Sequence, residues 1–157
     1  MLTRSSLSFA VLLACWGFHD ARAESEPGAH TEHHHPVHVA AFVGVVTSSH
    51  GTGPAAGIDL ERRFGPIGMA LVVDTARVSG ATVLSVIPAV VVHPWRGAKL
   101  MGGTGWERSH GHDELVLRAA AGYDLHVGAL SFGPTMAVDR VGETTAVVMG
   151  ATVGAGF

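Results

Sequence analysis

The chain has 157 residues, of which 47% are apolar and only 15% are charged, with a formal net charge of −3. Ordinary soluble domains carry about 25% charged residues, so this composition argues against one. The acidic balance, the lack of a basic stripe and the lack of a phosphate-binding glycine loop argue against nucleic-acid partners.

The first segment, Met1 to Ala23, has the pattern of a secretory signal peptide. It carries Arg4 near its start, an apolar centre and the small-residue ending Ala21-Arg22-Ala23, so it is excluded from the fold. Cys15, the only cysteine, lies inside it. A second reading is therefore lipoprotein processing, with Cys15 as the lipidated first residue. Cleavage after Ala23 instead leaves a chain that cannot form a disulfide.

The segment from Glu24 to Pro36 is polar, rich in histidine and bounded by proline, which predicts a flexible leader. Neutral imidazoles bind Zn, Cu or Ni, so its histidines are candidate ligands for a divalent metal ion, the one cofactor considered. The spacing fits no closed zinc motif. Two interpretations remain, a metal-binding leader or a solvated segment that binds metal adventitiously. The candidate metal ligands are His30, His33, His34, His35 and His38, with the pair His110 and His112 further along.

After the leader, no segment has the roughly 18 unbroken apolar residues of a membrane-spanning helix. Apolar or alternating runs of strand length follow one another instead, separated by Gly, Pro, Asp and Ser clusters. They predict an all-β fold over Val37 to Phe157, an eight-stranded antiparallel up-and-down transmembrane β-barrel, and an even strand number suits such a barrel. The expected strands are Val37–Thr47, Ala55–Arg63, Ile67–Thr75, Thr82–Val92, Ala98–Glu107, Glu114–His126, Ala129–Asp139 and Thr144–Phe157.

Alternation along the strands places nearly every mid-strand charge on one face. A lipid-facing charge costs about 2 to 4 kcal/mol at the bilayer midplane, so this face should be the lumen. The interior of an eight-stranded barrel is just wide enough for its side chains, and buried charges there must be paired. We expect Arg118 to pair with Glu61, Glu107 or Asp59. The predicted lumen ion-pair network is Asp59, Glu61, Arg63, Lys99, Glu107, Glu114, Arg118 and Asp124. The other reading of this set is a solute pathway.

Two runs fit the barrel pattern less well. Thr82 to Val92 is apolar on both faces, and Ala70 and Val72 would point into the lumen. A secreted soluble β-sandwich is the alternative fold for such a pattern.

The last residues, Thr145 to Phe157, read TAVVMGATVGAGF, with an apolar face and a small face that alternate. This ending, with the stretches GYDL and FGPTMAVD before it, resembles the small OmpA-like or porin-like outer-membrane β-barrels of Gram-negative bacteria. The resemblance implies that Phe157 is the signal read by the β-barrel assembly machinery. It also implies partners among outer-membrane lipids and lipopolysaccharide, and both termini on the periplasmic side.

In that orientation the outer loops would be Ser48–Pro54, Ala76–Ala81, Arg108–Asp113 and Arg140–Glu143, and the periplasmic turns would be 64–66, 93–97 and 127–128. Short outer loops argue against an adhesin or a receptor. The resemblance implies a structural or envelope role. The alternatives are a narrow porin-like channel and a metal-binding leader that faces the periplasm.

An enzyme is the remaining class, because some small outer-membrane barrels modify lipid A. Ser109, His110 and His112 can be read as a nucleophile with its base. The chain has no His-x-Ser-Asn motif of those families, so we predict no enzyme and no catalytic residues.

Overall fold

The computed structural model describes residues 36–109 and 111–157. The predicted signal peptide and nearly all of the leader lie outside the described residues. None of the described residues forms a helix long and apolar enough to cross a membrane. These residues form one nine-membered antiparallel sheet whose strands are β1 (Val37–Ser48), β2 (Gly51–Phe64), β3 (Ile67–Val78), β4 (Ala81–Val92), β5 (Ala98–Ser109), β6 (His112–Tyr123), β7 (Leu125–Val127), β8 (Leu130–Val141) and β9 (Thr144–Gly156).

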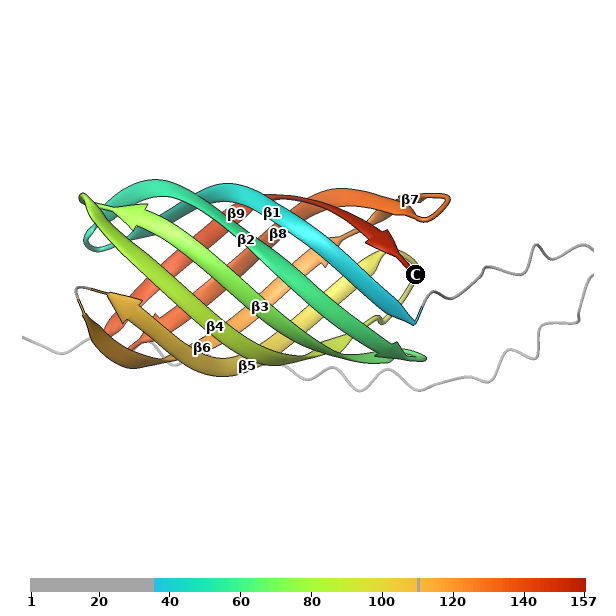
Figure 1. Cartoon of the computed structure of the whole chain (residues 1–157), viewed down its shortest axis with the longest axis horizontal. Coiled ribbons are helices and arrows are strands. Elements are labelled where there is room, and N and C mark those ends of the chain that lie inside the picture. The colour runs from blue at the N-terminus through green and yellow to red at the C-terminus, as the bar shows by residue number, and fades with distance from the viewer. Residues whose placement is uncertain (1–35, 110) are drawn as a thin grey trace, which may run out of the picture. The chain divides into compact units, whose positions relative to one another are not determined.

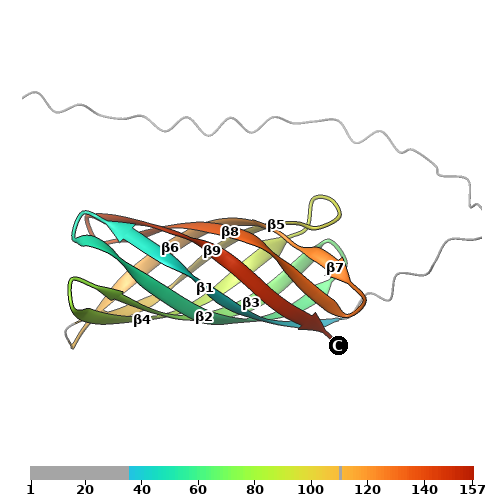
Figure 2. The same ribbon diagram turned by 90° about the horizontal axis from the view of Figure 1, so that it is seen from above.

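The sheet closes on itself, as Figures 1 and 2 show. From β1 to β6 each strand pairs with the next along the chain, β8 pairs with β9, and β9 returns to pair with β1 from His38↔Gly156 to Ser48↔Ala146. Both β6 and β7 pair with β8, so together they form one barrel strand. Pairing lapses at Tyr123 and Asp124, which fall opposite Pro134 and Gly133 in the register, and Pro134 has no N–H to donate. The fold is therefore a closed eight-stranded antiparallel up-and-down barrel, as the sequence predicts.

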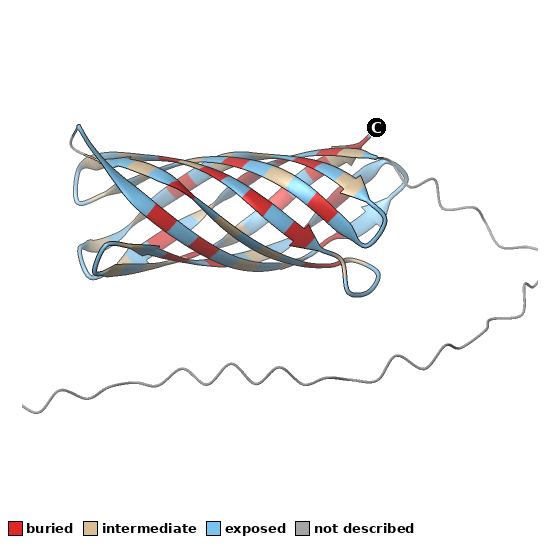
Figure 3. Cartoon of the chain, turned by 90° about the horizontal axis from the view of Figure 1, so that it is seen from below, coloured by how far each residue is buried: buried red, intermediate tan, exposed pale blue. Residues whose placement is uncertain are grey.

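Buried and exposed residues alternate along every long strand (Figure 3). In β9, Val148 and Thr152 are buried, while Met149 and Val153 are exposed. This is the arrangement of a barrel in lipid, in which the apolar side chains face outward and the small or polar ones face the lumen.

The inward-pointing apolar residues of β3 and β4, which depart from the barrel pattern expected from the sequence, pack against one another. Val72 of β3 and Ile87 of β4 are cross-strand partners that point into the lumen, where they pack with Val116 of β6. All three are at most 2% exposed. The inward apolar residues of these strands therefore form a small core on one side of the lumen.

The expected outer loops are wrong in extent, because the strands continue into tight turns at 49–50, 79–80 and 142–143, and because β5 extends to Ser109 and β6 begins at His112. The sequence places Pro54 in the first outer loop, but in the structure it belongs to β2 and its exposed ring faces outward. Its neighbour Gly53 approaches β3 so closely that a Cβ atom would lie 1.7 Å from the Arg77 carbonyl oxygen. At the second turn, Ser79 and Gly80 have φ of 49° and 85°. Positive φ at both central residues characterises the type I′ hairpin turn.

The two ends of the barrel chain lie side by side. Val37 N–H donates to the Phe157 carbonyl oxygen at 3.2 Å, and Phe157 N–H donates to the Val37 carbonyl oxygen at 2.8 Å. The connections that follow β2, β4 and β7 lie at this same end (Figure 1). Phe157 thus completes the seam between the first and last strands, and its role as an assembly signal stays a prediction.

Candidate functional site in the barrel lumen

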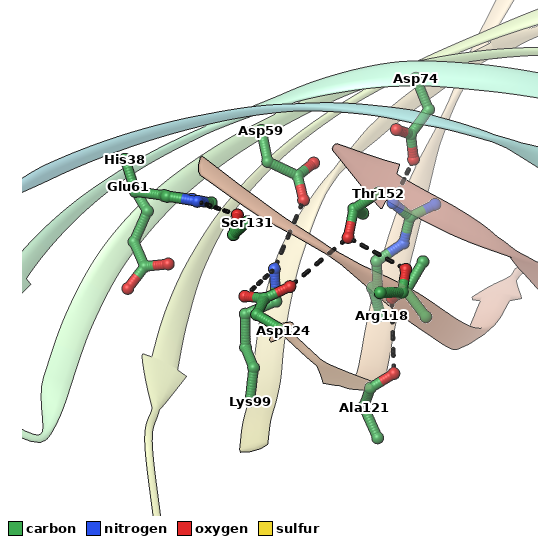
Figure 4. A network of polar contacts seen from close by, with 12 residues as sticks. His38, Asp59, Glu61, Asp74, Lys99, Arg118, Ala121, Asp124, Ser131 and Thr152 are labelled. Carbon is green, nitrogen blue, oxygen red and sulfur yellow. Dashed lines mark hydrogen bonds and ion pairs between the residues drawn. The ribbon is translucent and has the colours of Figure 1, made fainter. Parts of the chain in front are cut away.

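Polar side chains from different strands meet in successive layers along the lumen (Figure 4). The first layer lies nearest the chain ends. There the Glu61 Oε1 atom accepts a hydrogen bond from Arg63 Nε at 3.1 Å and lies 2.6 Å from His93 Nε2. In the same region His38 Nε2 lies 2.7 Å from Ser131 Oγ. Glu61, His38 and Ser131 are all buried, so their side chains lie inside the barrel.

The second layer is centred on Lys99. Its Nζ atom lies 4.0 Å from Asp59 Oδ2 and 4.0 Å from Asp124 Oδ2. Thr152 Oγ1 lies 3.5 Å from Asp124 Oδ1 and 3.3 Å from the Gly133 carbonyl oxygen. The Lys99 ammonium group thus lies between two carboxylates, that of Asp59 on β2 and that of Asp124 between β6 and β7.

The third layer is the Arg118 cluster, which comprises Arg118, Asp74 and Asp139. Arg118 donates to Asp139 through Nε at 2.7 Å and through Nη2 at 2.6 Å, a bidentate pair, and its Nη1 donates to Asp74 Oδ2. The side chains are only 6%, 12% and 7% exposed in that order. Arg118 and Asp139 face each other on β6 and β8, whereas Asp74 reaches in from β3.

The expected partners of Arg118 are therefore wrong. None of Glu61, Glu107 and Asp59 contacts the guanidinium group; its partners are Asp74 and Asp139, which the predicted network omitted. Both aspartates follow the inward alternation of their strands, two residues after Val72 and Ala137. That alternation is the signal that could have found them.

The eight residues of the predicted network fall into separate groups. Glu61 pairs with Arg63, and Lys99 lies between Asp59 and Asp124. Glu107 and Glu114 join no ion pair among the described residues. Glu107 accepts a hydrogen bond from Ser85 Oγ at 3.2 Å, and Glu114 is exposed.

Phe42 and the Arg118 cluster separate two cavities. The larger cavity, of about 450 Å³, occupies the half of the lumen away from the chain ends, and the smaller, of about 30 Å³, adjoins it on the side of the chain ends. Phe42, Asp74, Arg118 and Val148 line both, so we call these four residues the septum. The Phe42 ring packs over Gly44 and Gly150, which are cross-strand partners on β1 and β9. A Cβ atom on Gly150 would lie only 2.5 Å from Phe42 Cε2. No sequence pattern singles out Phe42.

The candidate metal ligands are not brought together in the described part of the chain. His38 is 4% exposed and points into the lumen toward Ser131, which removes it from the leader group. His30, His33, His34, His35 and His110 lie outside the described residues. His112 is exposed at the outer end of β6. Within residues 36–109 and 111–157, no three potential ligands gather at one point.

The candidate nucleophile and base are likewise not assembled. Ser109 and His112 are cross-strand partners at the end of the β5–β6 hairpin. No hydrogen bond joins their side chains in the described residues, and His110 lies outside them. Among the described residues, Ser109 and His112 therefore do not form the nucleophile–base pair that covalent catalysis uses.

No protein-family model and no curated protein sequence matches the chain significantly. Solved structures do. Neisserial surface protein A (NspA) superposes with a TM-score of 0.60 at 14% identity, over 77% of this chain and 96% of that one. Ail, the attachment invasion locus protein of Yersinia pestis, superposes with a TM-score of 0.56 at 11% identity, over 76% of this chain and 98% of that one.

The chain has the fold of the small eight-stranded outer-membrane β-barrels. A second structure of Yersinia pestis Ail, in complex with the heparin analogue sucrose octasulfate, gives a TM-score of 0.52 at 12% identity over 77% of this chain and 99% of that one. At such identities the similarity concerns the fold alone. It confirms the fold class and the resemblance to small outer-membrane barrels predicted from the sequence.

Proposed function

We propose that this protein is an integral barrel of the Gram-negative outer membrane with a structural role in the envelope, and that its lumen is closed to solutes. The observation that carries the proposal is the septum together with the two ion-pair layers beneath it. Phe42 and Arg118 line the cavity of about 30 Å³, and Lys99 lies between the carboxylates of Asp59 and Asp124, so we infer that side chains close the lumen at both depths. A solute would have to separate buried charge pairs to pass, and unpairing one buried charge costs about 3 to 5 kcal/mol.

The outer surface supports the location. Its exposed apolar side chains, such as Ile58, Leu117 and Val153, need lipid around them, because such an area exceeds what soluble monomers expose. Trp95, in the connection between β4 and β5, and Tyr123, at the end of β6, are exposed near the end where the chain termini meet, the level at which aromatic residues favour the membrane interface. The partners that follow are outer-membrane lipids, lipopolysaccharide and the assembly machinery.

The tight turns of the outer hairpins argue against an adhesin, and the arrangement of their side chains argues against an enzyme. Their turns are tight, and contacts with large partners usually need longer loops than these. Ser109 and His112 do not form a nucleophile–base pair. We therefore propose no catalytic residue.

A narrow channel is the second candidate, and the large outer cavity favours it. This cavity would be the entrance of a pathway if the septum moved. The leader histidines would add metal binding on the periplasmic side, independently of the barrel.

A deletion strain tests the envelope role against the channel. Loss of the protein should raise sensitivity to detergent and to large hydrophobic antibiotics, while the uptake of small sugars and amino acids stays unchanged. The chain carrying Phe157→Asp, which should not insert, is the matched control for complementation. Reduced uptake of small solutes with no change in detergent sensitivity would favour the channel.

A further inference from the structure

The outer half of the lumen contains the cavity of about 450 Å³, for which a closed envelope barrel has no need. All eight barrel strands contribute to its wall, the septum forms its floor, and His50 and His112 lie at its mouth. Protein pockets for small molecules have volumes of about 300 to 1,000 Å³. The cavity is therefore large enough for a small organic molecule that enters from the outer end.

The wall is mainly apolar. Its aliphatic side chains include Val46, Val78, Val83, Val141 and Val148, and alanines fill much of the space between them. Water-filled barrel lumens are polar instead. Burying apolar area against another apolar surface is favourable, so this wall favours a ligand with an aliphatic or aromatic body.

The charged side chains of the wall are mainly acidic, and hydroxyl groups and two histidines make up the rest of its polar part. Glu107 of β5 and Glu114 of β6 lie directly opposite each other, and both line the cavity. Like charges at facing strand positions are destabilising. Among the described residues no Lys or Arg pairs with either carboxylate, and Glu107 has only the Ser85 hydroxyl as a partner.

The one guanidinium group in the described wall cannot compensate these charges. Arg118 lies at the floor, where Asp74 and Asp139 already occupy its donors. A cation between the two glutamates would relieve their repulsion and gain two attractions. An anion in the same place would meet two like charges.

We propose that this cavity binds a small organic amine with an apolar body, with its ammonium group between Glu107 and Glu114 and its body against the valines. The site goes beyond the proposed envelope function, because a ligand can bind from the outer end without passing the septum. A metal ion alone would use the carboxylates but leave the apolar wall uncovered.

The test uses the barrel in phosphatidylcholine nanodiscs with two fluorescent probes that share one aromatic body, the cationic dansylcadaverine and the anionic dansylglycine. We expect saturable one-to-one binding of the cation, measured by fluorescence anisotropy, and none of the anion. The double variant Glu107→Gln with Glu114→Gln should weaken cation binding by at least about tenfold. Magnesium ion in excess should compete only weakly.

Two further variants separate the cavity from general charge effects. Asp113→Asn removes the carboxylate next to Glu114 in sequence, but this side chain is 51% exposed and pairs with Arg108 away from the cavity. It should bind the cation as the wild type does. Ala146→Trp fills the cavity without changing its charge and should abolish binding. Heat-modifiable migration on gels checks that each variant is folded.

The proposal is overturned if the wild type fails to bind the cation or binds both probes equally. It is also overturned if the double glutamine variant or a folded Ala146→Trp variant binds as tightly as the wild type. Equal loss of binding in Asp113→Asn and in the double variant would show a diffuse surface charge effect and would contradict the site.

Discussion

Replacing Arg118 by alanine should destabilise the barrel strongly. The change leaves Asp74 and Asp139 close together and without their shared cation. All three side chains are at most 12% exposed, so water screens the remaining charges little. Removing one partner of a buried ion pair costs about 3 to 5 kcal/mol, and this range is our expected loss in the free energy of unfolding. Urea unfolding in lipid vesicles, followed by tryptophan fluorescence, measures it.

Two variants serve as controls for that value. Arg118→Met combined with Asp74→Asn and Asp139→Asn removes every charge of the cluster, and it should recover most of the stability because no buried charge is left unpaired. Arg108→Ala breaks an ion pair whose side chains are 61% and 51% exposed, and it should change stability little. If Arg118→Ala unfolds within about 1 kcal/mol of the wild type, water reaches the cluster and the reasoning fails.

Three further predictions concern the lipid face, the seam and the leader. Met149→Arg places a charge on the lipid face midway along β9 and should lower the free energy of unfolding in urea by about 2 to 4 kcal/mol. Thr145→Arg, near the strand end, should lower it by only about 0 to 1 kcal/mol, and equal losses would contradict the membrane placement. Deleting Phe157 should lower the amount of protein in outer-membrane fractions while signal cleavage stays intact, and normal levels would remove its role in assembly. By calorimetry, the mature protein should bind Zn or Cu more tightly than a chain that starts at Pro36, and equal affinities would eliminate the leader as the site.

The barrel was predictable because one physical rule acts along the whole described chain. Because lipid lies outside and a narrow lumen inside, apolar and small or polar side chains must alternate with a period of two. Met149 falls on the exposed face and Thr152 on the buried face, as this rule requires. The hairpin ends were less predictable, because Pro54 and its glycine neighbours also suit a loop. An outward proline and a close strand contact at Gly53 keep that segment in the sheet instead.

The partners within the lumen could not be read from the alternation. Asp74 and Arg118 are 44 residues apart and meet across the lumen, so their contact depends on the stagger of strands that do not pair with each other. Phe42 and Val43 are both apolar, and composition alone does not decide which one points inward. Gly44 and Gly150 decide it, because only glycine leaves room for the ring.

Single-channel recording in planar lipid bilayers tests the closed lumen most directly. The wild type should show no steady open level, because the septum and the Lys99 layer fill the lumen between the outer cavity and the end where the termini meet. Phe42→Ala combined with Arg118→Ala removes the two largest side chains of the septum but leaves the Lys99 layer, so this variant should also show no steady open level. A steady open level in the wild type would contradict the account and support a narrow channel.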